Sequence, residues 1–255
     1  MKINELAGQN YATGAGIRVD FTAVLNDQAV IGLEGNPNQS RLEFSNNPND
    51  TTATTSTEWD YVVVFTYELD LKKIDGEKAV DENGNEVEIP LQGAEFTLQN
   101  AAGDYVILDE EGRVTSWTNE KEQASVLISD EQGNFKVVGL DDGTYTLTET
   151  KAPEGYNLLG SPIEIIVKAT TTNDHNYAAD PEKALTALEI KVDAGAFQPG
   201  TTDDGTVNAV IENNKGATLP ETGGIGTTIF YVAGGMLVLL AVVLLVTKRR
   251  MGENN

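Results

Sequence analysis

Short segments of alternating apolar and polar residues, separated by turn-forming residues, recur along most of the chain. A period of two places successive side chains on opposite faces of a β-strand. Breaks rich in Gly, Asn and Pro favour tight antiparallel connections between such strands. The strand patterns cover residues 17–25, 61–75, 94–99, 105–108, 135–140, 145–150, 163–169 and 206–213. The predicted fold class is all-β, most simply a sandwich, and only residues 179–190 suggest a helical turn.

The composition is strongly acidic and excludes several kinds of function. The 255 residues include 40 Asp and Glu against 17 Lys and Arg, for a formal net charge of -23. No nucleic acid is expected as a partner, because nucleic-acid binding requires the opposite charge. There is no cysteine, so disulfides and thiolate metal sites are ruled out. The single histidine, His175, has no second imidazole to share a metal or a catalytic triad, and no cofactor is expected.

An uncharged, largely apolar segment over residues 223–247 is followed at once by Lys248, Arg249 and Arg250. About 20 apolar residues suffice to span a bilayer as a helix. Basic flanking residues remain on the cytoplasmic side. We therefore predict one transmembrane helix over residues 225–247 and a cytoplasmic tail over residues 248–255. An ordinary single-span membrane anchor is the simplest explanation of this segment alone.

A short motif directly before the span points to a more specific role. It consists of Leu219, Pro220, Glu221, Thr222 and Gly223. With the span and the basic tail it resembles the LPxTG sorting signal of Gram-positive wall proteins, joined to the preceding domain through residues 217–224. The resemblance implies that a pilin-type or housekeeping sortase attacks the Thr222 carbonyl. The acyl group would pass to peptidoglycan or to a lysine of another pilin subunit, so the membrane would hold the chain only transiently.

Three further segments stand out: LDLKKID at 69–75, LQGAEF at 91–96 and YTLTETKAPEGY at 145–156. Together they resemble the Cna protein B-type (SpaA-like) domain of pilins and surface adhesins. The resemblance implies an Ig-like antiparallel β-sandwich over residues 67–216, with insertions at 110–130 and 170–204.

Residues 1–66 resemble the C-terminal half of a fimbrial isopeptide-formation (D2-type) domain, which is also a β-sandwich. The two patterns in succession resemble a major, or backbone, pilin of the SpaA type. The N-terminus lacks an apolar signal region, and the chain lacks a YPK-like pilin motif. We therefore expect an N-terminally truncated polypeptide whose signal peptide and acceptor lysine lie upstream of Met1.

Strand parity directs one lysine toward the interior. In the strand predicted at 61–75, Lys73 continues the apolar stripe that includes Leu69 and Leu71. Lys72 falls on the opposite face. Lys73 is therefore the candidate interior amine.

The same reasoning selects one carboxyl and one amide. Glu149 shares a face with Leu147 in the strand at 145–150, and Asn213 shares a face with Ile211 in the last strand. Three apolar stripes therefore end in a lysine, a carboxyl and an amide.

The family resemblance implies an isopeptide cross-link between Lys73 and Asn213, promoted by Glu149 as the catalytic carboxyl. Burial favours a neutral, nucleophilic lysine and a protonated carboxyl. A protonated Glu149 would polarise the Asn213 carbonyl and carry protons as ammonia leaves. The alternative is that Lys73 extends its charge to solvent at a sandwich edge and that Glu149 is exposed.

Two weaker sites lie elsewhere. Asn46 shares a face with Leu42 and Phe44 and is a possible acceptor of a second cross-link in the first domain. Residues 81–86 are rich in oxygen ligands but lack EF-hand spacing. A hairpin turn at Asn83-Gly84 is favoured over a calcium site, and no metal is predicted.

We therefore expect a structural subunit of a sortase-assembled pilus, located at the cell wall and anchored to peptidoglycan. The alternative is a wall-anchored adhesin in which the B-type domain is a stalk. An enzyme is disfavoured because the sequence shows no nucleophile–histidine pair, metal cluster or phosphate-binding loop.

Overall fold

The computed structural model describes residue 16, residues 18–26, 28–45, 47, 49, 52–172 and 183–216. Four predicted features lie outside the described residues: Asn46, the motif at 219–223, the helix at 225–247 and the tail at 248–255. Within the described part, no helix has the length and apolar character needed to cross a membrane.

The all-β prediction is confirmed, because helical conformation among the described residues is limited to the 3-10 turn η2 (Lys121–Gln123) and to Lys183. The largest sheet has eight strands, of which β11 (Leu127–Ile128) pairs with β8 (Glu95–Gln99) beside the main path. The main path runs in the order β10 (Val114–Thr118), β9 (Tyr105–Leu108), β8 (Glu95–Gln99), β13 (Gly143–Lys151), β14 (Ile163–Thr171), β15 (Leu185–Val192) and β16 (Gln198–Pro199).

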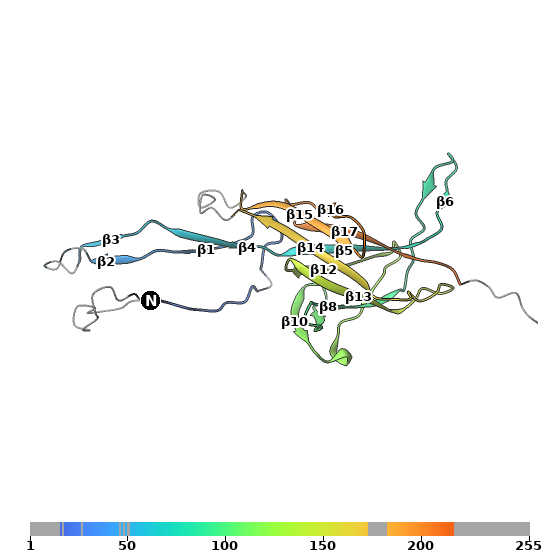
Figure 1. Cartoon of the computed structure of the whole chain (residues 1–255), viewed down its shortest axis with the longest axis horizontal. Coiled ribbons are helices and arrows are strands. Elements are labelled where there is room, and N and C mark those ends of the chain that lie inside the picture. The colour runs from blue at the N-terminus through green and yellow to red at the C-terminus, as the bar shows by residue number, and fades with distance from the viewer. Residues whose placement is uncertain are drawn as a thin grey trace, which may run out of the picture.

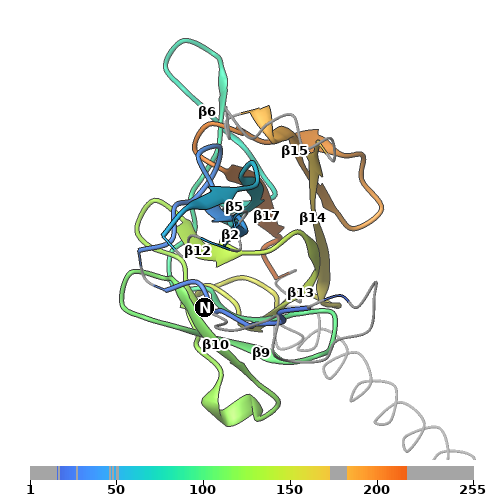
Figure 2. The ribbon, with the colours of Figure 1, turned by 90° about the vertical axis from the view of Figure 1, so that its left-hand side faces the viewer.

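A three-stranded sheet lies against the large one, in the order β12 (Asn134–Leu140), β5 (Tyr67–Asp75) and β17 (Thr206–Asn213). Strands β13, β14 and β15 curve around it (Figure 2). β12 is antiparallel to β5, but β17 runs parallel to β5. This pair departs from the fully antiparallel sandwich that we expected. Its consequence is that strands more than 130 residues apart in sequence lie side by side.

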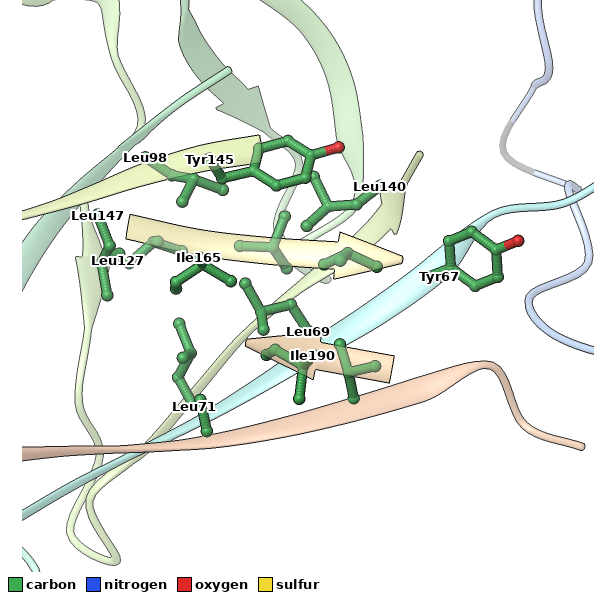
Figure 3. Packing of buried hydrophobic residues seen from close by; sticks show 14 of the residues in the cluster. Tyr67, Leu69, Leu71, Leu98, Leu127, Leu140, Tyr145, Leu147, Ile165 and Ile190 are labelled. Carbon is green, nitrogen blue, oxygen red and sulfur yellow. The ribbon is translucent and has the colours of Figure 1, made fainter. Parts of the chain in front are cut away.

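The core fills the space between these two sheets. Tyr67, Leu69 and Leu71 point inward from β5, as their parity predicts, and each is at most 2% exposed. They face residues from β8, β12, β13, β14 and β15 (Figure 3). The rings of Phe96 and Phe135 stack with centroids 4.8 Å apart. Apolar burial of this kind contributes about 25 cal/mol per Å² removed from water.

The part before β5 has a different architecture. β1 (Asn36–Ser40) pairs with β4 (Asp60–Val64), and β2 (Glu43–Ser45) pairs with β3 (Thr54–Ser56). These pairs form a ribbon that extends away from the two packed sheets (Figure 1). At the other end, β6 (Ala79–Val80) and β7 (Glu86–Val87) form a protruding hairpin.

Two strand predictions were wrong in detail. The described residues between 18 and 26 form no strand, and Phe21 is 72% exposed, because an alternating pattern does not itself supply a pairing partner. The single strand expected at 61–75 is divided by Phe65 and Thr66, where Thr66 bonds back to the Val30 carbonyl at 3.3 Å.

Of the segment 179–190, where we expected a helical turn, residues 179–182 lie outside the described residues and Lys183 has 3-10 conformation. From Leu185 onward the segment is strand β15, because pairing with β14 outweighs local helix propensity. β10 was not anticipated.

Gly133 fixes the backbone of Lys73. The Lys73 N–H donates to the Gly133 carbonyl at 2.7 Å, and the Lys73 carbonyl accepts the Leu91 N–H at 2.9 Å. Gly133 has φ +79°, and a Cβ there would lie 2.3 Å from the Lys73 carbonyl oxygen. Only glycine fits this turn without moving the strand that carries Lys73.

We predict that Gly133→Ala lowers the free energy of unfolding far more than Gly84→Ala does. Gly84 has a similar φ of +83° but meets nothing within 4 Å, so its substitution costs about 1 kcal/mol of backbone strain. At Gly133 the collision should add roughly 2 kcal/mol. Chemical denaturation followed by circular dichroism measures both, and equal losses would contradict the close approach.

Candidate cross-link site

Lys73 lies at the interface between β5 and β17 and is fully buried, with 0% exposure. Its Nζ donates to the carbonyl oxygen of Ile211 at 2.9 Å. Ile211 is the residue of β17 that pairs with Lys73. Lys72 points outward and forms an ion pair with Glu88 at 2.8 Å. The two neighbouring lysines therefore have opposite environments.

Burial changes the protonation of Lys73. Desolvation lowers the pKa of Lys73 from 10.5 to about 8, although the negative charges of Glu149, Glu212 and Asp75 act in the opposite direction. At pH 7 the neutral fraction of such an amine is roughly 300-fold larger than that of an ordinary lysine. A neutral amine is the form that can act as a nucleophile.

Glu149 and Asn213 meet directly. Asn213 Nδ2 donates to the two carboxylate oxygens of Glu149 at 2.9 and 3.1 Å, and it also lies 3.0 Å from the Asn157 carbonyl oxygen. Asn213 is 1% exposed and Glu149 is 5% exposed. The side chains selected by parity on β5, β13 and β17 thus lie in one buried region.

The amide of Asn213 is oriented with its nitrogen toward the carboxyl. Its oxygen, Oδ1, is the one buried side-chain polar atom without a hydrogen-bond partner in the described part of the chain. An unpaired buried acceptor costs about 1–3 kcal/mol. Glu149 thus contacts the nitrogen that would leave, rather than the carbonyl oxygen that we expected it to polarise.

A short backbone segment covers this region. Leu159 donates its N–H to Glu149 Oε2 at 2.8 Å, and Asn157 supplies the carbonyl that contacts Asn213. The Asn157 N–H also bonds the Asn214 carbonyl at 3.1 Å. We call residues 156–159 the strap.

A second polar cluster lies at the end of the strap. Asp75, with a fully buried side chain, accepts the Tyr156 hydroxyl at 2.8 Å, the Lys215 ammonium at 2.8 Å and the Glu77 N–H at 3.0 Å. These contacts lower the pKa of Asp75 to about 2, with the Lys215 hydrogen bond as the largest cause. This cluster was not predicted from the sequence. The available signal was Asp75 at the end of the β5 pattern and Tyr156 within the KAPEGY segment.

The other predicted site residues either lie outside the described residues or form an ordinary turn. Asn46 and residues 219–223 lie outside the described residues. Asp81 lies in the β6–β7 hairpin and accepts the N–H groups of Asn83 and Asn85 at 2.9 and 2.8 Å, which is a self-contained turn. Across the described ranges, no group of three His, Cys, Asp or Glu side chains is arranged to hold a metal ion.

Comparison with protein-family models identifies two regions. Residues 70–180 match the SpaA prealbumin-like fold domain, and residues 211–251 match the LPXTG cell wall anchor motif. The first region contains Lys73 and Glu149, and the second contains Asn213 and Thr222. The anchor motif gives the chain a cell-wall-anchored location at the cell surface.

Streptococcal proteins are among the relatives of this chain. The trypsin-resistant surface T6 protein of Streptococcus pyogenes serotype M6 is 24% identical over 285 aligned positions, covering 91% of this chain and 48% of that protein. The group B streptococcus pilus 2b backbone protein is 26% identical, with a TM-score of 0.41, and the match covers 69% of this chain and 48% of that protein. The T6 backbone pilin structure is 22% identical, with a TM-score of 0.43, and the match covers 76% of this chain and 46% of that pilin.

The chain thus spans about half the length of these relatives. In its SpaA domain, its LPXTG anchor motif and its likeness to the T6 protein, the chain is similar to LPxTG-anchored Gram-positive surface proteins.

Proposed function

We propose that the chain is a structural subunit of a sortase-assembled pilus, stabilised by an isopeptide bond between Lys73 and Asn213. The observation that carries the cross-link is the burial of Lys73 beside the strand that presents the Asn213 amide to Glu149. The anchor motif supports attachment through Thr222, and the T6 relative supports a pilin role.

The three side chains supply every atom and proton that the reaction needs. Neutral Lys73 Nζ attacks Asn213 Cγ, a new C–N bond forms, and the Cγ–Nδ2 bond breaks. Glu149 takes a proton from the attacking nitrogen and delivers one to Nδ2, which leaves as ammonia. The 2.9 Å contact between Nδ2 and Glu149 suits this transfer. The site acts once on its own chain, so the protein is not an enzyme with an external substrate.

The position of the bond suits a fibre subunit. The chain enters the packed sheets at the start of β5 and leaves them at the end of β17, and these two strands are parallel neighbours. Tension along the chain therefore shears β5 against β17. A covalent bond from Lys73 to Asn213 carries this tension across the pair without loading the residues between them.

We also propose the domain boundaries given above: a partial D2-type domain over residues 1–66, the B-type domain over 67–216, the linker at 217–224, the membrane span at 225–247 and the tail at 248–255. In this scheme Thr222 is transferred first to a lysine of a neighbouring subunit, and to peptidoglycan at the base of the fibre. Asn46 would accept a second cross-link in the first domain.

The mass of the full chain tests the internal cross-link. We expect the intact mass to fall short of the sequence mass by one ammonia molecule, and peptide mapping to recover a branched peptide joining Lys73 to Asn213. Lys73→Met and Glu149→Gln should each restore the full mass. Lys72→Met is the matched control, because this side chain points outward, and it should leave the ammonia loss unchanged. A parent chain of full mass would refute the bond.

The rate of ammonia loss should depend on the protonation of Lys73. With its pKa at about 8, the neutral fraction rises about tenfold from pH 6 to pH 7 and levels off above pH 8. Freshly synthesised chain, held at a series of pH values and sampled by mass spectrometry, should show this rise. A rate that is flat from pH 6 to pH 8, or that keeps rising beyond pH 10, would contradict a desolvated nucleophile.

Attachment through Thr222 is tested in a Gram-positive host that supplies sortase, with a secretion signal fused before Met1 of the parent and of each variant. The parent chain should appear in the enzymatically released wall fraction, whereas Thr222→Ala should remain with the membrane. Thr218→Ala, just before the motif, should behave like the parent. Wall recovery of Thr222→Ala at the parent level would refute the attachment. Pilus assembly further predicts ladders of covalent oligomers on SDS gels that resist boiling.

A further inference from the structure

We propose that the strap, residues 156–159, orients the Asn213 amide for cross-linking, and that Tyr156 is the positioning residue that anchors the strap. This inference rests on the proposed Lys73–Asn213 bond, and it assigns a role to residues outside the three reacting side chains. Tyr156 itself touches none of the reacting atoms; it acts through Asn157 and Leu159.

The contacts of the Asn213 amide fix its orientation. A carboxamide can rotate by half a turn and exchange its oxygen and nitrogen. Around Asn213 Nδ2 lie three acceptors: the two Glu149 oxygens and the Asn157 carbonyl. Rotation would bring Oδ1 against these oxygens with no donor between them when Glu149 is ionised. The Asn157 carbonyl cannot become a donor at any pH, so the strap keeps the leaving nitrogen on the Glu149 side.

The strap also holds the Glu149 carboxyl. Leu159 donates its N–H to Glu149 Oε2 at 2.8 Å. The strap therefore holds both the amide that is attacked and the carboxyl that carries protons. These two backbone contacts come from residues two positions apart, so a single displacement of the strap would disturb both.

The strap is itself held through Tyr156. After β13 ends at Lys151, the chain regains a strand only at Ile163. Between Lys151 and Ile163, the described backbone forms one isolated β-bridge, which pairs Tyr156 with Lys215. The Tyr156 hydroxyl bonds Asp75, the last residue of β5, and Lys215 follows β17 and bonds the same carboxylate. Tyr156 thus ties the strap to the ends of the two strands that the cross-link would join.

The anchor is insensitive to pH over the range in which Lys73 titrates. Asp75 remains ionised well below neutrality, because its three donors stabilise the charged form. Loss of the Tyr156 hydroxyl should therefore slow the reaction without moving its pH midpoint. Such a result separates positioning from any change in the protonation of Lys73.

The test uses the full chain with Tyr156→Phe, which keeps the ring and removes the hydroxyl. Tyr145→Phe is the matched control, because its hydroxyl also donates one hydrogen bond, to the Asp141 carbonyl at 2.9 Å, at the other end of β13. We expect Tyr156→Phe to slow ammonia loss per folded molecule by about tenfold or more, since a hydrogen bond to a charged group is lost. The pH midpoint should stay the same, and Tyr145→Phe should retain the parent rate.

A second measurement does not depend on the cross-link. In a Lys73→Met chain the Asn213 amide persists, and its hydrogen exchange can be followed by ¹⁵N NMR. Adding Tyr156→Phe should accelerate this exchange about tenfold, and adding Tyr145→Phe should not. Should Lys73→Met fail to fold, backbone exchange at Asn157 and Leu159 in the Tyr156→Phe chain replaces it, with the same expected acceleration.

The outcomes separate the two claims. If the parent loses no ammonia, the proposed bond fails, while the exchange measurement still decides the role of the strap. If Tyr156→Phe matches the parent in both rate and exchange, the positioning role is overturned. A slower rate with a shifted pH midpoint would overturn it as well, because Tyr156 would then act on protonation rather than on orientation.

Discussion

The parallel pairing of β5 with β17 is the constraint on which the rest of this structure depends. It brings the first and last strands of the packed sheets together, and it forms one wall of the core. It also places Lys73 opposite Ile211 and Asp75 opposite Asn213. Both polar clusters, the candidate cross-link site and the Asp75 cluster, therefore lie at the same end of one strand pair.

Burial gives this pairing its chemical character. A lysine with no exposed surface has lost its hydration, and its pKa falls because the charged form is penalised most. The Asp75 carboxylate is equally inaccessible, yet its pKa moves down, because three donors compensate for the lost water. Two buried ionisable groups on one strand thus respond to burial in opposite ways: the neutral, nucleophilic form of Lys73 becomes more accessible, whereas the charged form of Asp75, suited to anchoring, is stabilised. Their different partners account for the contrast.

Local alternation was enough to predict which side chains face inward on β5, β13 and β17, because parity depends only on the strand itself. It selected Lys73 over Lys72 without knowledge of the pairing. It could not predict that β17 lies parallel to β5, since that depends on how the intervening strands pack. The Tyr156–Asp75 contact joins residues 81 positions apart and was missed for the same reason. The described residues between 18 and 26 show the opposite failure, because their alternating pattern has no pairing partner. From Leu185 onward, pairing with β14 overrides the local helical pattern.

The central claim is that β5 and β17 are joined covalently, and stretching a single molecule tests it most directly. The chain contains no cysteine, so cysteine handles placed before β5 and after β17 would be unique attachment points. The bond should prevent release of the residues between Lys73 and Asn213, so the parent should show no long unfolding step. Glu149→Gln, which lacks the promoting carboxyl, should release roughly 450–500 Å of chain. A step of that length in the parent would contradict the account.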